Sequence, residues 1–304
     1  MTIDSLLTSQ HGVVSRTQLE ELHMTRSAIR WLVTDKRLEK FVGATFRARD
    51  GQKPRWEQFA MVPSLLYGAS LSHQTAALLW GIEGFTDRET FHFLVKGSSS
   101  PDLGSQYKVH RSNRELVPTE RSGFKVTSLA RTLLDVSETL PDDLDLEIAL
   151  DSAHYRRPFL EQELDEEIGR VKQQQTPGAQ RLLHLLDVRG GVCTESPLET
   201  RARRVLRKTK LPRPVLQHEI FHDGKYVMRV DFAWPAHKVA LHCDGAGWHN
   251  RRKQFELDAK QRSELAALGW ASSIVTRRML DSDAWLDPLS RTIAGRDPQA
   301  KLAL

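Results

Sequence analysis

Two turn signals divide part of the C-terminal third of the chain into three short strands. An Asp-Gly hairpin dipeptide separates the runs Leu216–Phe221 and Tyr226–Trp234. Pro235 ends the second run because proline cannot donate to a strand ladder, and Lys238–Asp244 supplies the third run. The sequence therefore predicts a hairpin followed by an apolar strand that ends in Cys-Asp-Gly-Ala-Gly.

Two aspartates lie where these strands end or pair. Alternation places Val230, Phe232 and Trp234 on one face of the second run, and Asp231 on the opposite face. Asp244 follows the apolar third strand into a glycine turn. An unpaired carboxylate within an apolar strand is costly unless something binds it, and two acids at neighbouring strand ends can share a divalent cation. Oxygen ligands suit Mg²⁺ or Mn²⁺, so the sequence predicts a metal site that presents water to a phosphodiester.

Each candidate also has a structural interpretation. A serine three residues before Glu199, followed by proline, forms a capping box, so Glu199 can serve to cap a helix. Asp244 alone is a common turn residue, and a single histidine such as His249 is more often structural than catalytic. Asp258 and Arg262 are spaced as i and i+4, which predicts an ordinary helical ion pair.

These motifs occur in a fixed order: a helix acid, a hairpin, an aspartate in a strand, a strand ending in CDG, then GWH, and finally DAKQRSELAALGW before a last strand. Over roughly residues 190–280 this order resembles the very-short-patch-repair-like family of restriction-type endonuclease folds. The resemblance implies Asp231 as the main metal ligand, Asp244 as a second acid, Glu199 as the upstream helix carboxylate and His249 as a general base. Many relatives carry Glu where this chain has His242, which removes one hard oxygen ligand, and the restriction-type lysine is not evident.

Length and charge limit the remaining choices. At 304 residues the chain exceeds one typical domain, so we expect two or three, each able to bury a core. Lys and Arg total 44 against 39 Asp and Glu, and this net charge of +5 suits a polyanion where the charges cluster. No apolar run predicts a membrane span, and the N-terminus lacks a signal-peptide pattern. The two cysteines, Cys193 and Cys243, have no metal-type spacing, so we expect a reduced cytoplasmic protein without a membrane partner.

Residues 1–50 have the pattern of a winged helix-turn-helix. The spacing predicts helices over Ile3–Ser9, from a cap at Ser15, and over Thr25–Val33, followed by a two-stranded wing over Leu38–Arg49. The outer face of the third helix would enter a major groove, and the positive charges that follow would contact phosphates. The predicted DNA-contacting residues are Arg26, Ser27, Arg30, Arg37 and Lys40. A small helical module can instead dock a protein, and a charged face can be merely solvated.

Two further motifs follow this module. They read LSHQTAALLWGI at Leu71–Ile82 and GFKVTSLARTLLDV at Gly123–Val136, with a short β region between them. Together with the opening module they resemble the antitoxin of the AbiE type, or a relative in its regulator family, over roughly residues 1–150. The resemblance implies an architecture and a regulatory role rather than an activity. We interpret His73 as a polar residue of a helix cap and Asp135 as a surface acid.

The region from Asp142 to Lys172 is predicted to be helical and is strongly acidic, which is the opposite of a DNA surface. We expect this acidic block to face solvent, a protein partner or the basic N-terminal module. A Gln-rich run ending in Thr-Pro-Gly follows it, so residues 173–191 are predicted to be a linker.

The last domain opens with a helix over Pro197–Lys208 whose apolar residues have helical spacing and which carries many arginines. Positive charge near a metal site would hold a phosphate backbone. The residues predicted to bind this backbone are Arg201, Arg204, Arg207, Lys208, Arg251 and Arg252. Trp248 either stacks on a base or packs in the core.

The sequence therefore predicts an α+β protein. Its expected parts are a winged helix-turn-helix at 1–50, an α/β regulator-like domain at 51–172, a linker at 173–191, and a restriction-endonuclease-like mixed sheet flanked by helices at 192–304. The predicted function is cleavage or nicking of DNA by a Mg²⁺- or Mn²⁺-dependent endonuclease. The alternative is a non-catalytic, antitoxin-like regulator with a degenerate nuclease fold, which His242 favours. RNA as substrate, a homodimer, and a cognate toxin or other protein partner stay open.

Overall fold

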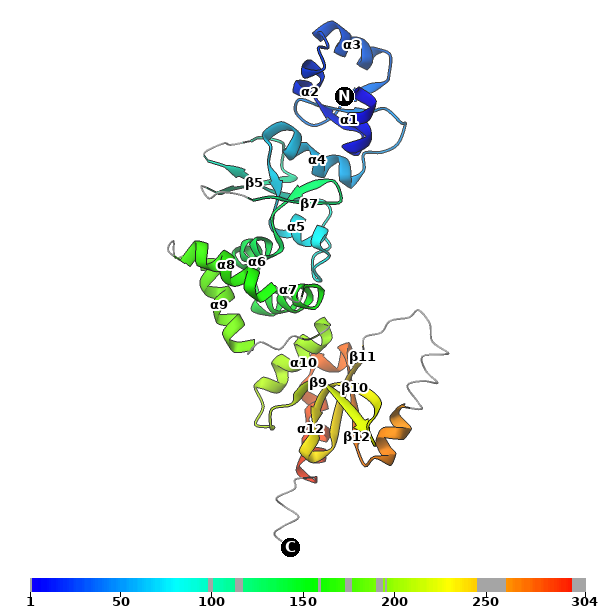
Figure 1. Cartoon of the computed structure of the whole chain (residues 1–304), viewed down its shortest axis with the longest axis vertical. Coiled ribbons are helices and arrows are strands. Elements are labelled where there is room, and N and C mark those ends of the chain that lie inside the picture. Colours follow the sequence, from blue (N-terminus) through cyan, green and yellow to red (C-terminus); the bar gives the residue numbers. More distant parts are fainter. Residues whose placement is uncertain are drawn as a thin grey trace. The chain divides into compact units, whose positions relative to one another are not determined.

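The computed structural model describes residues 2–97, 101–112, 117–157, 160–172, 177–189, 194, 196–244 and 261–296. The chain divides into two compact units, each of which contains helices and strands, so the predicted α+β class is confirmed (Figure 1). The first unit comprises Met1–Ala149 and Arg157–Leu185, and the second unit comprises Leu150–Arg156 and Leu186–Leu304. The first 50 residues thus belong to the first unit. None of the helices in the described ranges combines the length and apolar character needed to cross a bilayer.

The N-terminal part of the first unit holds three helices and a small sheet. In order these elements are α1 (Ile3–Ser9), β1 (Val13–Ser15), α2 (Arg16–Glu21), α3 (Arg26–Thr34), β2 (Leu38–Lys40) and β3 (Thr45–Ala48). The three predicted helices are confirmed, and each begins where the side chain of Thr2, Ser15 or Thr25 accepts a hydrogen bond from a backbone N–H of the first turn. The strand β1 was not predicted. It pairs with β3 to give an antiparallel sheet of order β1-β3-β2, which packs on the helices through Leu19 and Phe46.

A five-stranded mixed sheet follows, with helices around it. Its segment of chain contains α4 (Trp56–Tyr67), β4 (Ser70–Leu71), α5 (His73–Trp80), β5 (Phe91–Lys96), β6 (Tyr107–Ser112), β7 (Thr119–Arg121) and β8 (Phe124–Val126). The strand order is β6-β5-β4-β8-β7, and β5 runs parallel to β6. Four helices come next: α6 (Leu129–Thr139), α7 (Asp143–Arg156), α8 (Leu160–Lys172) and α9 (Pro177–Arg189). The helix α5 ends at Gly81, which adopts the left-handed conformation, and the side chain of Ser128 caps α6.

Burial contradicts one of the two expectations for polar residues of this unit. His73 begins α5 next to the N-cap Ser72, as expected of a cap residue, and is buried. Asp135 is only 5% exposed, so the prediction of a surface acid is wrong. Asp135 tolerates burial because Arg131, one helical turn earlier, pairs with it. Glu147 and Glu167, which belong to the acidic block, are also buried. The prediction that this block faces outward is therefore wrong for these two side chains.

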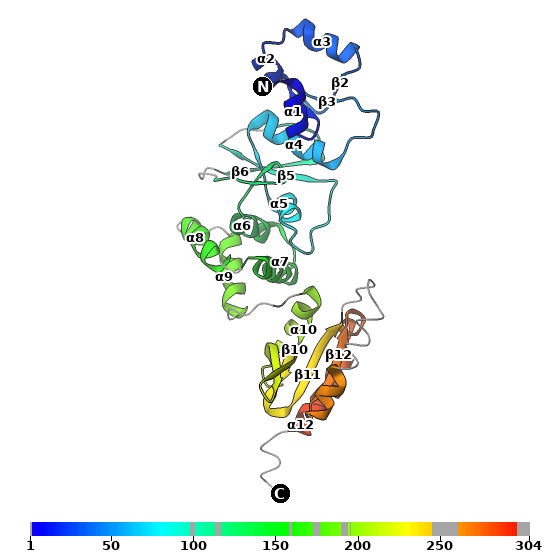
Figure 2. The ribbon, with the colours of Figure 1, turned by 45° about the vertical axis from the view of Figure 1, so that its right-hand side comes forward.

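The second unit is built on a four-stranded sheet. Its elements are α10 (Pro197–Arg207), β9 (Val215–His222), β10 (Lys225–Trp234), η1 (Pro235–His237), β11 (Val239–Asp244), β12 (Ala271–Thr276), η2 (Arg277–Asp281), η3 (Asp283–Trp285) and α12 (Leu286–Ala294). The strand order is β12-β11-β10-β9. Figure 2 labels β10, β11 and β12 of this sheet. The predicted hairpin is present as the antiparallel pair β9–β10, β11 is antiparallel to β10, and β12 runs parallel to β11.

Apolar side chains cover both faces of this sheet. Phe232 packs in a core with residues of α10 and α12, whereas Val230 packs in a second core with Leu265, in the helix at 261–267. The prediction that Val230 and Phe232 share a face is therefore wrong. The change of face falls at Asp231, which lies between them.

A buried carboxylate ties an earlier segment of chain into the second unit. The Asp151 Oδ2 atom accepts hydrogen bonds from the Thr194 hydroxyl at 2.7 Å and from the Thr200 hydroxyl at 2.9 Å. All three side chains are buried. The segment Leu150–Arg156 therefore completes the second unit although it lies in α7.

Candidate functional site

A cavity of about 170 Å³ lies against β10, β11 and β12 in the second unit. The polar residues that line it are Asp231, His242, Cys243, Asp244, Gln261 and Arg262. The structure thus brings together four residues that the sequence nominated, from three different elements: Asp231, His242, Asp244 and Arg262. Arg262, expected to form only a structural ion pair with Asp258, contributes to this cavity, and Asp258 lies outside the described residues.

Asp231 is half-buried in β10, and one of its oxygens has a partner within the protein. Its Oδ2 atom accepts a hydrogen bond from the backbone N–H of Cys243 at 2.7 Å. The last regular pair between β10 and β11 joins Phe232 to Leu241. The Asp231 carboxylate accepts the hydrogen bond from Cys243 just beyond that pair. The bond lowers the cost of a carboxylate within an apolar strand and fixes that carboxylate against β11.

Glu199 is 6% exposed in the first turn of α10. The predicted cap is confirmed for Ser196, whose hydroxyl oxygen accepts from the Glu199 N–H at 3.3 Å. The same hydroxyl donates to Glu199 Oε1 at 2.8 Å, and the Gln217 side-chain amide donates to Oε2 at 2.6 Å. The capping interaction therefore coexists with a contact between Glu199 and the sheet.

Gln217, which the sequence did not single out, is the residue of β9 that contacts Glu199. It lies in β9 between residues paired with Val230 and Phe232, which places it opposite Asp231. Its backbone φ is +49°, a conformation rarely adopted by a residue with a side chain. A glutamine in a strand whose residues alternate between two faces carries no distinctive sequence signal. Its contact with Glu199 becomes evident only from the register of β9 and the position of α10.

Cys243 lines the same cavity as Asp231. Burial raises the pKa of Cys243 well above its ordinary value, and the negative charges of Asp231 and Glu199 raise it further. The backbone N–H of the same residue holds the Asp231 carboxylate against β11.

The structure describes only some of the other residues of the predicted site. Asp244 ends β11 with an exposed side chain, and His242 is half-buried two residues earlier. The predicted site residues outside the described ranges are Trp248, His249, Arg251, Arg252 and Asp258. Among the described residues, no group of three His, Cys, Asp or Glu side chains is arranged to hold a metal ion.

The basic residues of α10 are less available than expected. Arg201, Arg204 and Arg207 are only partly exposed, and Arg203 is buried. Arg203, Arg204 and Arg207 each interact with another group of the protein. Lys208, at the C-cap of this helix, is exposed.

The basic surface of the N-terminal part matches its prediction more closely. The side chains predicted to face outward are exposed: Arg26, Ser27, Arg30, Arg37 and Lys40. Trp31 in α3 is also 57% exposed. Arg47 differs, because it is buried and pairs with Glu39, so it contributes to the fold and not to a charged surface.

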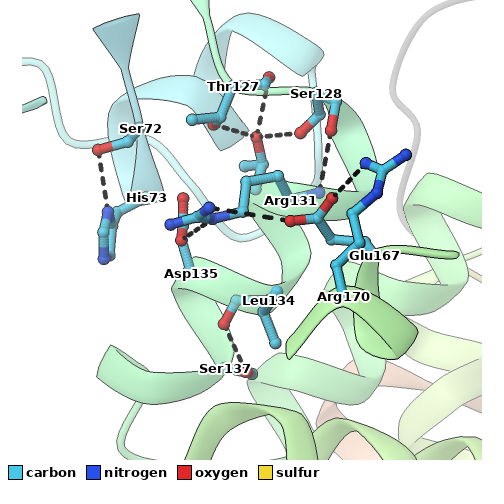
Figure 3. Close-up of polar contacts among 11 residues, drawn as sticks. Ser72, His73, Thr127, Ser128, Arg131, Leu134, Asp135, Ser137, Glu167 and Arg170 are labelled. Carbon is cyan, nitrogen blue, oxygen red and sulfur yellow. Dashed lines mark hydrogen bonds and ion pairs between the residues drawn. The ribbon is translucent and has the colours of Figure 1, made fainter. Parts of the chain in front are cut away.

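A second polar cluster lies between α6 and α8 in the first unit (Figure 3). Arg131 Nε donates to Asp135 Oδ1 at 2.7 Å, and Arg170 Nη1 donates to Glu167 Oε2 at 3.1 Å. Arg131 Nη1 also lies 3.8 Å from Glu167 Oε1. Burial raises the pKa of Asp135 to about 6, although Arg131 opposes the shift. A cavity of about 380 Å³ adjoins the cluster. The charged groups of the cluster already pair with one another, so we assign them to the packing of α6 against α8.

Three histidines gather at the five-stranded sheet of the first unit, where His92 lies in β5 and His110 in β6. His92 Nδ1 and His110 Nε2 are 2.9 Å apart, and the ring of His73 stacks on that of His110 with 3.4 Å between centroids. Burial lowers the pKa of His73 to about 2 and that of His110 to about 4, and the charge of neighbouring histidines adds to both shifts. Burial also lowers the pKa of His92. The cluster is therefore uncharged at neutral pH.

Comparison with known proteins gives few relatives. No protein-family model matches the chain. Two proteins of Mycobacterium tuberculosis are each 34% identical over 152 residues: the uncharacterized protein MT2308 of strain CDC 1551 / Oshkosh and the uncharacterized protein Rv2248 of strain ATCC 25618 / H37Rv. Each match covers 49% of this chain and 54% of the relative, so the chain spans about half the length of the curated relatives it matches.

A solved structure is also similar in part. The crystal structure of the RV2827C protein from Mycobacterium tuberculosis aligns with a TM-score of 0.42 and 18% sequence identity, over 73% of this chain and 87% of that chain. These similarities assign neither a family nor an activity, so a function has to be argued from the site.

Proposed function

We propose that the second unit is a metal-dependent endonuclease that cleaves or nicks DNA. The observation that carries the proposal is the cavity that Asp231, from β10, shares with Asp244, from β11, and with Arg262. Carboxylates gathered from adjacent strands, next to a cation, are suited to metal-assisted hydrolysis of a phosphodiester.

The donor chemistry of this cavity fits Mg²⁺ or Mn²⁺, with Asp231 and Asp244 as the protein ligands. Such an ion, when bound, polarises a phosphoryl oxygen and makes water a stronger nucleophile. The Cys243 N–H holds the Asp231 carboxylate in place, and Arg262 offers charged donors to a phosphate. We assign His249 as the base that accepts a proton from the attacking water.

We further propose that residues 1–50 are a winged helix-turn-helix that binds DNA. Support comes from the element order α1, β1, α2, α3, β2, β3 and from the exposed side chains of Arg26 and Arg30 on α3. The β2–β3 hairpin, with Lys40 exposed, is the proposed wing. Phosphate contacts by these cations would make binding weaken as salt concentration rises.

A nicking assay on supercoiled plasmid with Mg²⁺ or Mn²⁺ tests the nuclease. Asp231→Asn removes the charge but keeps an oxygen that can accept from the Cys243 N–H, so the fold should persist. We expect this substitution to lower the nicking rate by about 100-fold or more, by analogy with the loss of one electrostatic group in other active sites. Asp223→Asn, in the exposed hairpin turn, is the matched control and should nick like wild type. Wild-type protein that leaves plasmid, linear duplex and mismatched duplex intact would end the proposal.

A non-catalytic regulator is the second candidate. It is favoured by His242, which supplies no hard oxygen ligand to the cavity, and by the lack of a three-residue metal group among the described residues. This candidate expects sequence-specific DNA binding by the first unit without any divalent ion. It also expects His242→Glu to create a nicking activity that wild type lacks, since the substitution adds a carboxylate beside Asp231 and Asp244.

A further inference from the structure

An exposed tryptophan lies on the outer face of α3. Four exposed residues, spaced three or four positions apart, share this face of the helix: Ser27, Arg30, Trp31 and Thr34. The opposite face carries Ile29 and Leu32, which are buried in the core of the N-terminal part. Trp31 is therefore on the side of α3 that does not hold the helix in the fold.

The indole of Trp31 contributes little to the folded structure. It is 57% exposed, whereas tryptophan is highly buried on average. Within the described part of the chain its side chain has no hydrogen bond and no contact with another ring or cation. The hydroxyl of Thr34 donates to the backbone carbonyl of Arg30 at 3.0 Å, so it does not compete with the indole for a ligand. The large apolar ring thus stands among small or polar neighbours.

The charge around this tryptophan favours a nucleic acid over a protein as its partner. Arg26 and Arg30 are exposed, and neither side chain has an ion pair among the described residues. The helix, which reads RSAIRWLVT, contains no acidic residue. It also lies at the outer end of the first unit (Figures 1 and 2). A single apolar surface residue is ordinary on its own, but one set beside unpaired arginines on an accessible helix suits the edge of a base beside phosphates.

We infer that Trp31 determines sequence specificity in the N-terminal part, by packing its indole on the 5-methyl group of a thymine in the major groove. The inference rests on the proposed DNA binding by residues 1–50. The thymine methyl is the apolar group that base pairs present in this groove, whereas arginines contact phosphates or guanine. Contact between the methyl group and the indole removes apolar area of both from water. Arginines alone would give no preference for thymine at that position.

The experiment measures binding of the full-length protein to DNA in EDTA, so that divalent ions and cleavage play no part. The probe is a duplex that wild type selects from a library with a randomised centre. Each thymine of this duplex is then replaced singly by deoxyuridine, which lacks only the methyl group, and Kd is measured by fluorescence anisotropy. For at least one thymine, the replacement should weaken wild-type binding about fourfold, the loss expected for one buried methyl group. The same replacement should leave binding by Trp31→Ala unchanged.

Three variants separate base recognition from other effects. Trp31→Phe keeps an apolar ring and should keep the effect of deoxyuridine. Tyr155→Ala is the matched control, because Tyr155 is 60% exposed on a helix, α7, and lies in the second unit; this variant should bind like wild type. Arg30→Ala should lower the slope of log Kd against log salt by about one, whereas Trp31→Ala removes no charge and should leave that slope unchanged.

The thermal midpoint of Trp31→Ala should equal that of wild type, because the ring is exposed. Binding by this variant is measured at low salt, where phosphate contacts keep the affinity within range. If deoxyuridine weakens wild type and Trp31→Ala equally, or weakens neither, Trp31 does not contact a thymine methyl, and the inference fails while DNA binding stands. Wild type that binds no duplex overturns the proposed DNA binding and the inference together.

Discussion

Acidification should destabilise the first unit through its histidine cluster. Burial lowers the pKa of His73 from 6.5 to about 2, so the unfolded chain binds a proton that the folded unit excludes. The contribution of His73 to stability is therefore complete above about pH 6.5 and is lost progressively as the pH falls toward the folded pKa. Between pH 8 and pH 5 the linkage relation gives a loss of about 2 kcal/mol, or about 30-fold in the folding equilibrium.

Hydrogen exchange of the backbone amides in β5 and β6 measures this loss within the first unit. The comparison variant is His73→Asn, which removes the titrating ring, tolerates the positive φ of +48° and can still bond to Ser72. After correction for intrinsic exchange rates, protection in wild type should fall about 30-fold more than in the variant between pH 8 and pH 5. Equal losses in the two proteins would refute the argument, because the buried ring would then not couple protonation to folding.

Three further predictions concern packing and reactivity. Gly178→Ala should destabilise the first unit by about 1–3 kcal/mol, because a Cβ at this position would overlap side chains of α6. Gly169→Ala in α8 is the comparison: its Cβ would meet nothing within 4 Å, so it should stabilise the unit by up to about 1 kcal/mol. Thermal unfolding of the two variants measures the difference. Arg131→Met should lower the free energy of unfolding in urea by about 3–5 kcal/mol, because it leaves Asp135 buried without its cation. A loss below about 1 kcal/mol would contradict this expectation. Cys243 should react with iodoacetamide far more slowly in the folded than in the unfolded protein, as followed by peptide mass spectrometry, because its raised pKa and burial keep the thiolate scarce.

Local signals determined which parts of the fold were predictable. The hairpin at Asp223 and the strand end at Pro235 were predictable because turn residues act within a few positions of the chain. The strand Val13–Ser15 was not, since three residues carry no periodicity and become a strand only by pairing with β3. No helix was predicted over Trp56–Tyr67, where Pro63 lies inside the helix and normally argues against one.

The site shows the same limit. Asp231 could be nominated because a carboxylate in an apolar strand is anomalous on sequence alone. The contact of Gln217 with Glu199 could not be foreseen, because it depends on the register of β9 and on the position of α10. Asp135 was misplaced on the surface because a helical pattern does not show which partner, here Arg131, permits burial.

The second unit is built from two separate segments of the sequence, and the shorter segment supplies the buried carboxylate of Asp151. A truncation within the predicted linker, so that a fragment begins at residue 192, would keep the hydroxyls of Thr194 and Thr200 but remove the acceptor they share. The fragment would then lack the buried carboxylate that joins these two hydroxyls beside the first turn of α10, which carries Glu199. Loss of cleavage in such a fragment would report a missing piece of its scaffold, so activity belongs to measurements on the uncut chain.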